Sequence, residues 1–149
     1  MEHRDIKKLL KNLNIENLPP DSRRDLKRTA AQLDRKQRQA VVKEDFLSFV
    51  KYMWPAFIEG SHHRHVAEKF NKLREGKINR LIINMPPRHT KSEFASYLLP
   101  AWMIGNQPDL KIIQATHTAE LAVRFGRKAK HLMDSENYKE IFPTRLMED

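Results

Sequence analysis

The stretch Arg80-Leu-Ile-Ile-Asn-Met-Pro-Pro-Arg-His-Thr-Lys-Ser92 decides which fold the sequence predicts. Its first half, residues 80–85, places three aliphatic residues side by side between a turn and Pro86-Pro87, a pattern typical of a short buried strand. A polar loop, residues 87–90, follows, and the apolar positions then have helical spacing from about Lys91 onward. The stretch therefore predicts a strand that leads through a loop into a helix.

The same alternation continues further along the chain. Residues 110–115 form a second short aliphatic run, and Thr118 can cap a helix that extends to about Met133. A strand–helix–strand–helix order implies a parallel sheet with right-handed crossover connections. The sequence therefore predicts an α/β fold in which parallel strands are flanked by helices.

The region before the stretch has helical spacing. Apolar positions across residues 46–57 predict one helix that ends or kinks near Pro55, and residues 62–75 predict another that stops at Gly76. After the stretch, Pro100 is expected to kink the helix that begins near Lys91.

The first 42 residues are more polar. Two helices are predicted there, over residues 5–13 and from Ser22 to about Gln39, with a break at Leu18-Pro19-Pro20. The expected organisation is a helical N-terminal extension, residues 1–42, followed by the main domain, residues 43–149.

The loop carries part of the pattern that binds nucleotide phosphates. That pattern is Gly, four residues, then Gly-Lys-Ser/Thr. Lys91 and Ser92 match it, whereas Met85 and Thr90 stand at the two glycine places. At the start of a helix, Lys91 would reach the β- and γ-phosphates and Ser92 would bind Mg²⁺. The alternative is an ordinary strand–loop–helix unit whose lysine is solvated.

Residues 80–93 resemble the P-loop segment of the large subunit of tailed-phage terminases, in which the loop often reads Pro-Pro-Arg-His-Gly-Lys-Ser. The upstream His62-His63-Arg64 is similar to the same family. So are three downstream blocks, Ile112–Ala122, Phe125-Gly-Arg127 and Ile141-Phe-Pro143. The resemblance extends from about Phe46 to Pro143, and residues 1–42 have no match.

This resemblance implies a P-loop NTPase domain of the additional-strand class, here only in part, which uses ATP and Mg²⁺ to drive double-stranded DNA into a procapsid. In that family an RNase H-like nuclease follows the ATPase. The implied partners are DNA, the portal protein and the small terminase subunit, and the implied assembly is a homo-oligomeric ring. The implied location is the cytoplasm of an infected bacterial host.

The resemblance also implies site residues. Lys91 takes the phosphate role, Ser92 the Mg²⁺ role, and Arg88 matches the region of a loop arginine implicated in hydrolysis. Lys91 and Arg88 are therefore the expected catalytic residues, and residues 55–65 are expected to border the adenine. The full expected set of ATP contacts is Pro87, Arg88, His89, Thr90, Lys91, Ser92 and Glu93.

Two motifs of the family are missing from these 149 residues. No hydrophobic strand ending in Asp-Glu follows Ala115, so there is no Walker B aspartate and no catalytic glutamate, and no nuclease carboxylate cluster exists. Hydrolysis needs a residue that positions water and an acidic residue that holds the metal. We therefore expect a fragment, a truncated gene product or part of a split gene, nearly inactive by itself.

Charge and composition narrow the class of partner. The chain has 28 basic and 19 acidic side chains and a net charge of +9, which favours a polyanionic partner. Basic residues are densest between Arg23 and Lys43, where a solvated helix face is an equally good interpretation. The absence of cysteine excludes disulfides, Cys-ligated zinc and thiol nucleophiles. No apolar run is long enough to predict a membrane span, and the charged N-terminal residues do not resemble a secretory signal.

Alternatives stay open for function and for some residues. Another P-loop nucleic-acid enzyme, such as a helicase, and a non-enzymatic basic DNA-binding module are the rival functions. The triplet His62, His63 and His65 suggests zinc, but a role at the helix start or beside the nucleotide is favoured because no carboxylate-rich partner is evident. Trp54 and Trp102 lie in apolar stripes and are predicted to pack in the core. A basic helix face, either solvated or in contact with DNA or a neighbouring subunit, comprises Arg124, Arg127, Lys128 and His131.

Overall fold

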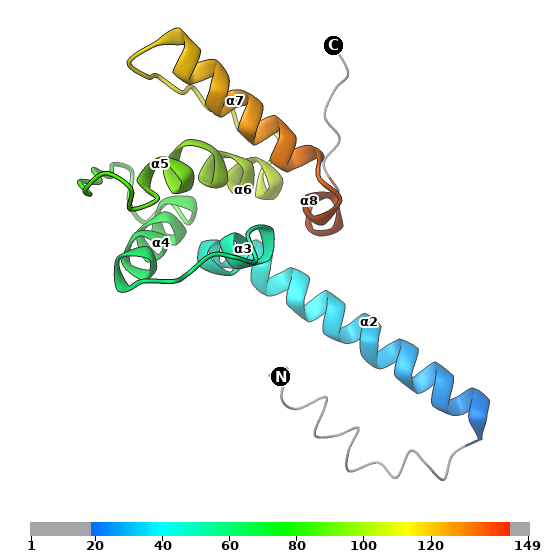
Figure 1. Ribbon diagram of the computed structural model, residues 1–149. Coiled ribbons are helices and arrows are strands. Elements are labelled where there is room, and N and C mark those ends of the chain that lie inside the picture. Colours follow the sequence, from blue (N-terminus) through cyan, green and yellow to red (C-terminus); the bar gives the residue numbers. More distant parts are fainter. Residues whose placement is uncertain (1–18, 144–149) are drawn as a thin grey trace. The chain divides into compact units, whose positions relative to one another are not determined.

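The computed structural model describes residues 19–143, and within them every regular element is a helix (Figure 1). The described residues divide into two compact units, with the boundary between Val41 and Val42. The elements in chain order are α2 (Pro20–Glu44), α3 (Phe46–Met53), α4 (Ser61–Arg74), α5 (Lys91–Glu93), the π-helix η2 (Phe94–Leu98), α6 (Leu99–Asn106), α7 (Ala119–Asp134) and α8 (Glu136–Ile141).

The predicted α/β fold with parallel strands is wrong. Residues 80–85 and 110–115 are extended, but neither pairs with another segment among residues 19–143, so the sheet expected of a partial P-loop NTPase is absent there. Ile82 and Ile113 are 86% and 95% exposed, whereas Leu81 and Ile83 pack against the core. A short aliphatic run indicates an extended backbone, but a strand also needs a neighbour for its N–H and C=O groups.

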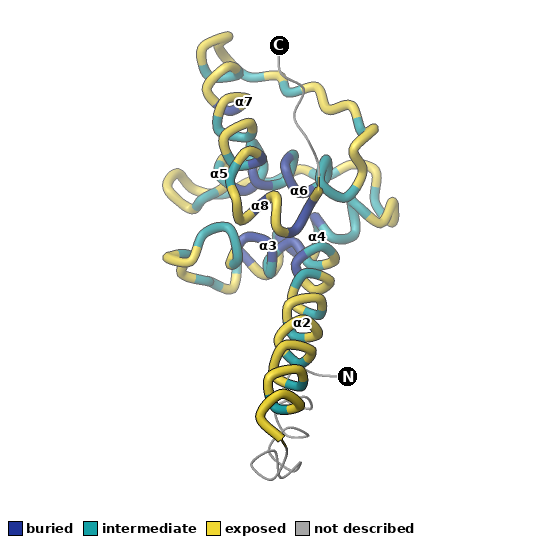
Figure 2. Tube along the Cα trace, turned by 90° about the vertical axis from the view of Figure 1, so that its right-hand side faces the viewer, coloured by how far each residue is buried: buried dark blue, intermediate teal, exposed yellow. Residues whose placement is uncertain are grey.

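The described part of the first unit belongs to α2. This helix begins at Pro20, two residues before the predicted cap Ser22, because the fixed φ of proline suits the first turn of a helix. Its surface is mostly exposed, and Val42 is its one buried residue (Figure 2). The helix predicted to end near Gln39 is confirmed and continues to Glu44. The helix predicted over residues 5–13 lies outside the described residues.

The last turn of α2, which belongs to the second unit from Val42 onward, is bound by side chains from α4 and α6. Trp102 Nε1 donates to the Val42 carbonyl at 3.2 Å, and Asn106 Nδ2 donates to the Lys43 carbonyl at 3.1 Å. Arg74 reaches both Lys43 and Glu44 carbonyls. These side chains satisfy carbonyls that a helix end leaves without internal partners.

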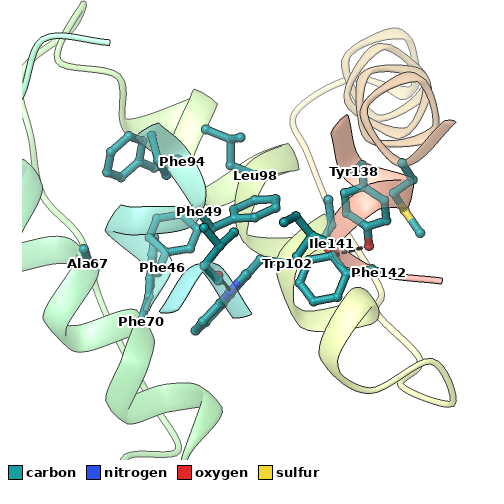
Figure 3. Packing of buried hydrophobic residues seen from close by; sticks show 14 residues of the cluster. Phe46, Phe49, Ala67, Phe70, Phe94, Leu98, Trp102, Tyr138, Ile141 and Phe142 are labelled. Carbon is teal, nitrogen blue, oxygen red and sulfur yellow. Dashed lines mark hydrogen bonds between the residues drawn. The ribbon is translucent and has the colours of Figure 1, made fainter. Parts of the chain in front are cut away.

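Aromatic rings from α3 form the centre of the core in the second unit. Phe46 is fully buried, and its ring meets Phe70, Phe94 and Trp102 edge-on at centroid distances of 5.0, 5.4 and 5.5 Å (Figure 3). Edge-to-face pairs of this kind add to the stabilisation from burial alone. Helix α3 thereby packs against α4, α6 and α8. The predicted core position of Trp102 is confirmed, whereas Trp54 is only half-buried.

Helix α8 is a short element that the sequence did not predict. Ser135 caps it, and the buried Tyr138 hydroxyl donates to the Ala101 carbonyl at 2.7 Å. Burial raises the pKa of Tyr138. A β-carbon on Gly105 would lie 2.6 Å from both the Phe142 ring and the Tyr138 hydroxyl. Glycine at this position is therefore what lets α8 pack closely on α6.

The chain is helical without interruption from Lys91 to Asn106, but its middle widens into the π-helix η2. Leu99 N–H donates to the Phe94 carbonyl, five residues back, and Pro100 follows without an N–H of its own. At the place where a kink was predicted, the structure thus has a π-helical turn, which ends just before Pro100. None of the helices within residues 19–143 combines the length and apolar character needed to cross a membrane.

Candidate phosphate-binding site

The loop between the extended residues 80–85 and the helix at Lys91 has two residues with left-handed backbone. Arg88 has φ 65° and Thr90 has φ 58° and ψ 10°. A side chain in this region costs about 1–2 kcal/mol because its β-carbon crowds the following carbonyl. Thr90 stands at the second glycine place of the P-loop pattern, so the backbone there adopts a conformation that glycine reaches freely.

The predicted start of a helix at Lys91 is confirmed. Phe94 N–H donates to the Thr90 carbonyl at 2.9 Å, which closes the first helical turn. The first N–H groups of a helix have no internal acceptor, and the helix dipole places partial positive charge at that end. Ser92 is exposed in this first turn. The loop and the helix start therefore provide donors that suit an anion.

Lys91 folds back over the loop that precedes it. Its ammonium donates to the Met85 carbonyl at 3.1 Å, at the point where the extended segment enters the loop. An ammonium has three hydrogens, so this single bond leaves donors for a ligand. Arg88 and His89 are exposed on the same loop, and His89 Nδ1 lies 2.9 Å from the Pro87 carbonyl. Of residues 87–92, all but the half-buried Thr90 are thus exposed.

Glu93 makes contacts different from those of the rest of the predicted set. Its carboxylate pairs with Lys128 of α7 at 3.1 and 3.2 Å, and that ammonium lies 5.2 Å from the centre of the Tyr97 ring. Burial, together with the charge of Glu93, raises the pKa of Tyr97 to about 12. Glu93 therefore links the loop helix to α7. Of the predicted basic face on α7, Lys128 turns inward in this way, while Arg124, Arg127 and His131 are exposed.

A pocket lies beside the loop, between α4 and the extended residues 81–85. Its volume is about 370 Å³, and His62, Val66 and Lys69 face Leu81, Ile83 and Met85 across it. His62 Nε2 is buried with no hydrogen-bond partner in the described part of the chain. The pocket wall is therefore mixed, with the aliphatic side chains of residues 81–83 beside His62, Lys69 and Asn84.

His63 plays the helix-start role that the sequence favoured. Its Nδ1 accepts from the Gly60 N–H at 2.9 Å, and its Nε2 lies 2.7 Å from Thr90 Oγ1. Both ring nitrogens thus contact the protein. Throughout residues 19–143, no three His, Asp or Glu side chains gather as metal ligands do.

The sequence did not link His63 to the loop. The two residues that meet, His63 and Thr90, are 27 positions apart. The available signal was a histidine just inside a predicted helix start, followed by a non-glycine residue at the second glycine place. Local spacing contains no information about which of the three neighbouring histidines contacts Thr90.

Comparisons with known proteins add no family assignment. No protein-family model matches the chain, and neither the curated proteins nor the solved structures contain a match to it.

Proposed function

We propose that residues 87–92 bind the phosphates of ATP together with Mg²⁺. The observation that supports this most directly is the left-handed Thr90, φ 58°, directly before the helix that starts at Lys91. The free N–H groups at the start of a helix can converge on one anion, which is how helix termini receive phosphate. The proposal depends on the loop and the helix, and it requires no parallel sheet.

Four of the seven predicted residues then have a defined task. Lys91 exchanges its bond to the Met85 carbonyl for phosphate oxygens, and Ser92 supplies a hydroxyl to the Mg²⁺ that ATP brings. Arg88 is exposed and can meet the negative charge of the terminal phosphate. Glu93 acts indirectly, because its carboxylate is engaged by Lys128.

We further propose that the chain is the ATP-binding part of a viral DNA-packaging motor of the terminase large-subunit type. The support is the resemblance over residues 46–143 and the excess of basic side chains, which suits double-stranded DNA. The portal protein, the small terminase subunit and a homo-oligomeric ring remain part of this proposal. Because the 149 residues contain no Walker B carboxylates, we expect nucleotide binding with almost no turnover.

The test is calorimetric titration of the chain with Mg²⁺-ATP and, separately, with Mg²⁺-triphosphate, at low and at moderate salt. Saturable binding of both ligands is expected, because the loop recognises phosphate. A rival basic DNA-binding module predicts salt-sensitive DNA binding that Mg²⁺-ATP leaves unchanged. Absence of saturable binding to either phosphate ligand would contradict the proposal.

A further inference from the structure

Apart from the aromatic Trp102 and Tyr138, His63 is the one buried side chain with polar atoms among residues 19–143. It is 6% exposed, at the third residue of α4. Its ring packs against Phe57 at 4.7 Å and Phe94 at 5.2 Å between centroids. A buried imidazole needs partners for both nitrogens, and His63 finds one in its own helix start and the other in the loop before Lys91.

The hydrogen positions along this contact follow from chemistry. A backbone N–H can only donate, so Gly60 N–H makes His63 Nδ1 the acceptor. The ring hydrogen then lies on Nε2 and is donated to Thr90 Oγ1 at 2.7 Å. The Thr90 hydroxyl in turn donates a hydrogen bond to the His89 carbonyl at 2.7 Å. Each donor in this series of hydrogen bonds has one acceptor. The series requires a neutral His63, because Nδ1 must be free of hydrogen to accept from Gly60.

Thr90 is the residue in the loop that most needs such support. It is β-branched and has a left-handed backbone, a combination that is a genuine outlier for residues other than glycine. Its carbonyl also receives the first helical hydrogen bond, from Phe94. A shift of Thr90 would therefore move the start of the helix and the Lys91 side chain with it.

We propose that His63 is a positioning residue of the phosphate loop: its Nε2–H holds Thr90 in the left-handed conformation that a glycine at this place would reach unaided. This inference rests on the proposed function. It assigns to α4 the task that the missing glycine performs elsewhere in P-loop patterns. His63 itself does not touch phosphate.

Burial and two neighbouring histidines favour the neutral form of His63. Burial lowers the pKa of His63 below its ordinary value of 6.5; the nearby His62 and His89 lower it further, and Glu59 opposes them. The contribution of neutral His63 is therefore complete above pH 6.5 and is lost as the pH falls through its lowered pKa. Protonation places a hydrogen on Nδ1 and breaks the bond from Gly60.

The experiment is a double-mutant cycle between His63→Ala and Thr90→Gly. With Thr90 present, His63→Ala is expected to weaken Mg²⁺-ATP binding about fivefold, in line with the loss of one hydrogen bond. With glycine at position 90, His63→Ala should have almost no effect on Mg²⁺-ATP binding, because glycine adopts the left-handed conformation without support. His63→Gln, which keeps an N–H donor, should recover part of the affinity. Equal losses in both backgrounds would overturn the inference.

Two measurements without nucleotide test the role of His63 independently of the proposed function. In the first, the free energy of unfolding in urea is measured for the same four proteins of the cycle. Coupling between positions 63 and 90 is again expected, and its absence would overturn the inference. The ¹⁵N spectrum of His63 in the unchanged protein at pH 8 should show hydrogen on Nε2 and none on Nδ1. The reverse tautomer would contradict the proposal even if every variant failed to fold.

Discussion

Lys91→Ala is expected to weaken the binding of Mg²⁺-ATP by about tenfold to a hundredfold, the range that corresponds to losing hydrogen bonds from a charged donor. Lys91 is exposed, and its one bond in this structure, to the Met85 carbonyl, lies inside the loop itself. Removing the side chain should therefore change affinity far more than stability. Calorimetric titration of the variant beside the unchanged protein measures the loss.

Lys111→Ala is the matched control for this prediction. Lys111 is also exposed but lies in the extended residues 110–115, away from the loop in sequence. Both variants remove one positive charge, so a general electrostatic effect would weaken binding equally in the two. If Lys111→Ala and Lys91→Ala lost the same affinity, the assignment of the phosphate site to residues 87–92 would be wrong.

Trp102→Ala is expected to reduce the free energy of unfolding by about 3–5 kcal/mol, the usual cost of deleting a large buried ring. Trp102 is fully buried, its ring meets Phe46 at 5.5 Å, and the Arg74 guanidinium lies 4.8 Å from the ring centre. The truncation also leaves the Val42 carbonyl without the indole N–H. Urea unfolding followed by circular dichroism measures the change.

The second tryptophan provides the comparison. Trp54 is half-buried and has a ring contact with Phe57 at 5.5 Å, so Trp54→Ala should cost clearly less than Trp102→Ala. The sequence predicts both residues in the core, and the structure separates them. Equal losses of stability for the two variants would show that the packing around Trp102 is not the centre of the core.

Helices were predictable because their signals are local. Thr118 accepts from Leu121 N–H as a cap, and Gly76 has the positive φ of 70° expected just after a helix end. Helix α8 has only six residues, too few to show a period, and it depends on contacts such as that between Tyr138 and Ala101. Local pattern therefore found the long elements and missed the short one.

The lack of pairing between residues 80–85 and 110–115 could not be predicted in the same way, because strand pairing is a property of two segments. Leu81 and Ile83 face the core and Ile82 faces outward, which is the alternation of an extended chain. That alternation is real, but the aliphatic run contains no information about a neighbouring backbone. The same limit applies to the contact from His63 to Thr90, which joins two elements distant in sequence.

The central claim, that phosphate binds at residues 87–92, is tested most directly by backbone amide spectra of ¹⁵N-labelled protein titrated with Mg²⁺-triphosphate. Saturable shifts are expected at Arg88, His89, Thr90, Lys91 and Ser92, with smaller shifts at His63. Shifts confined to the exposed basic residues of α2 and α7, or shifts that grow linearly without saturation, would contradict the claim.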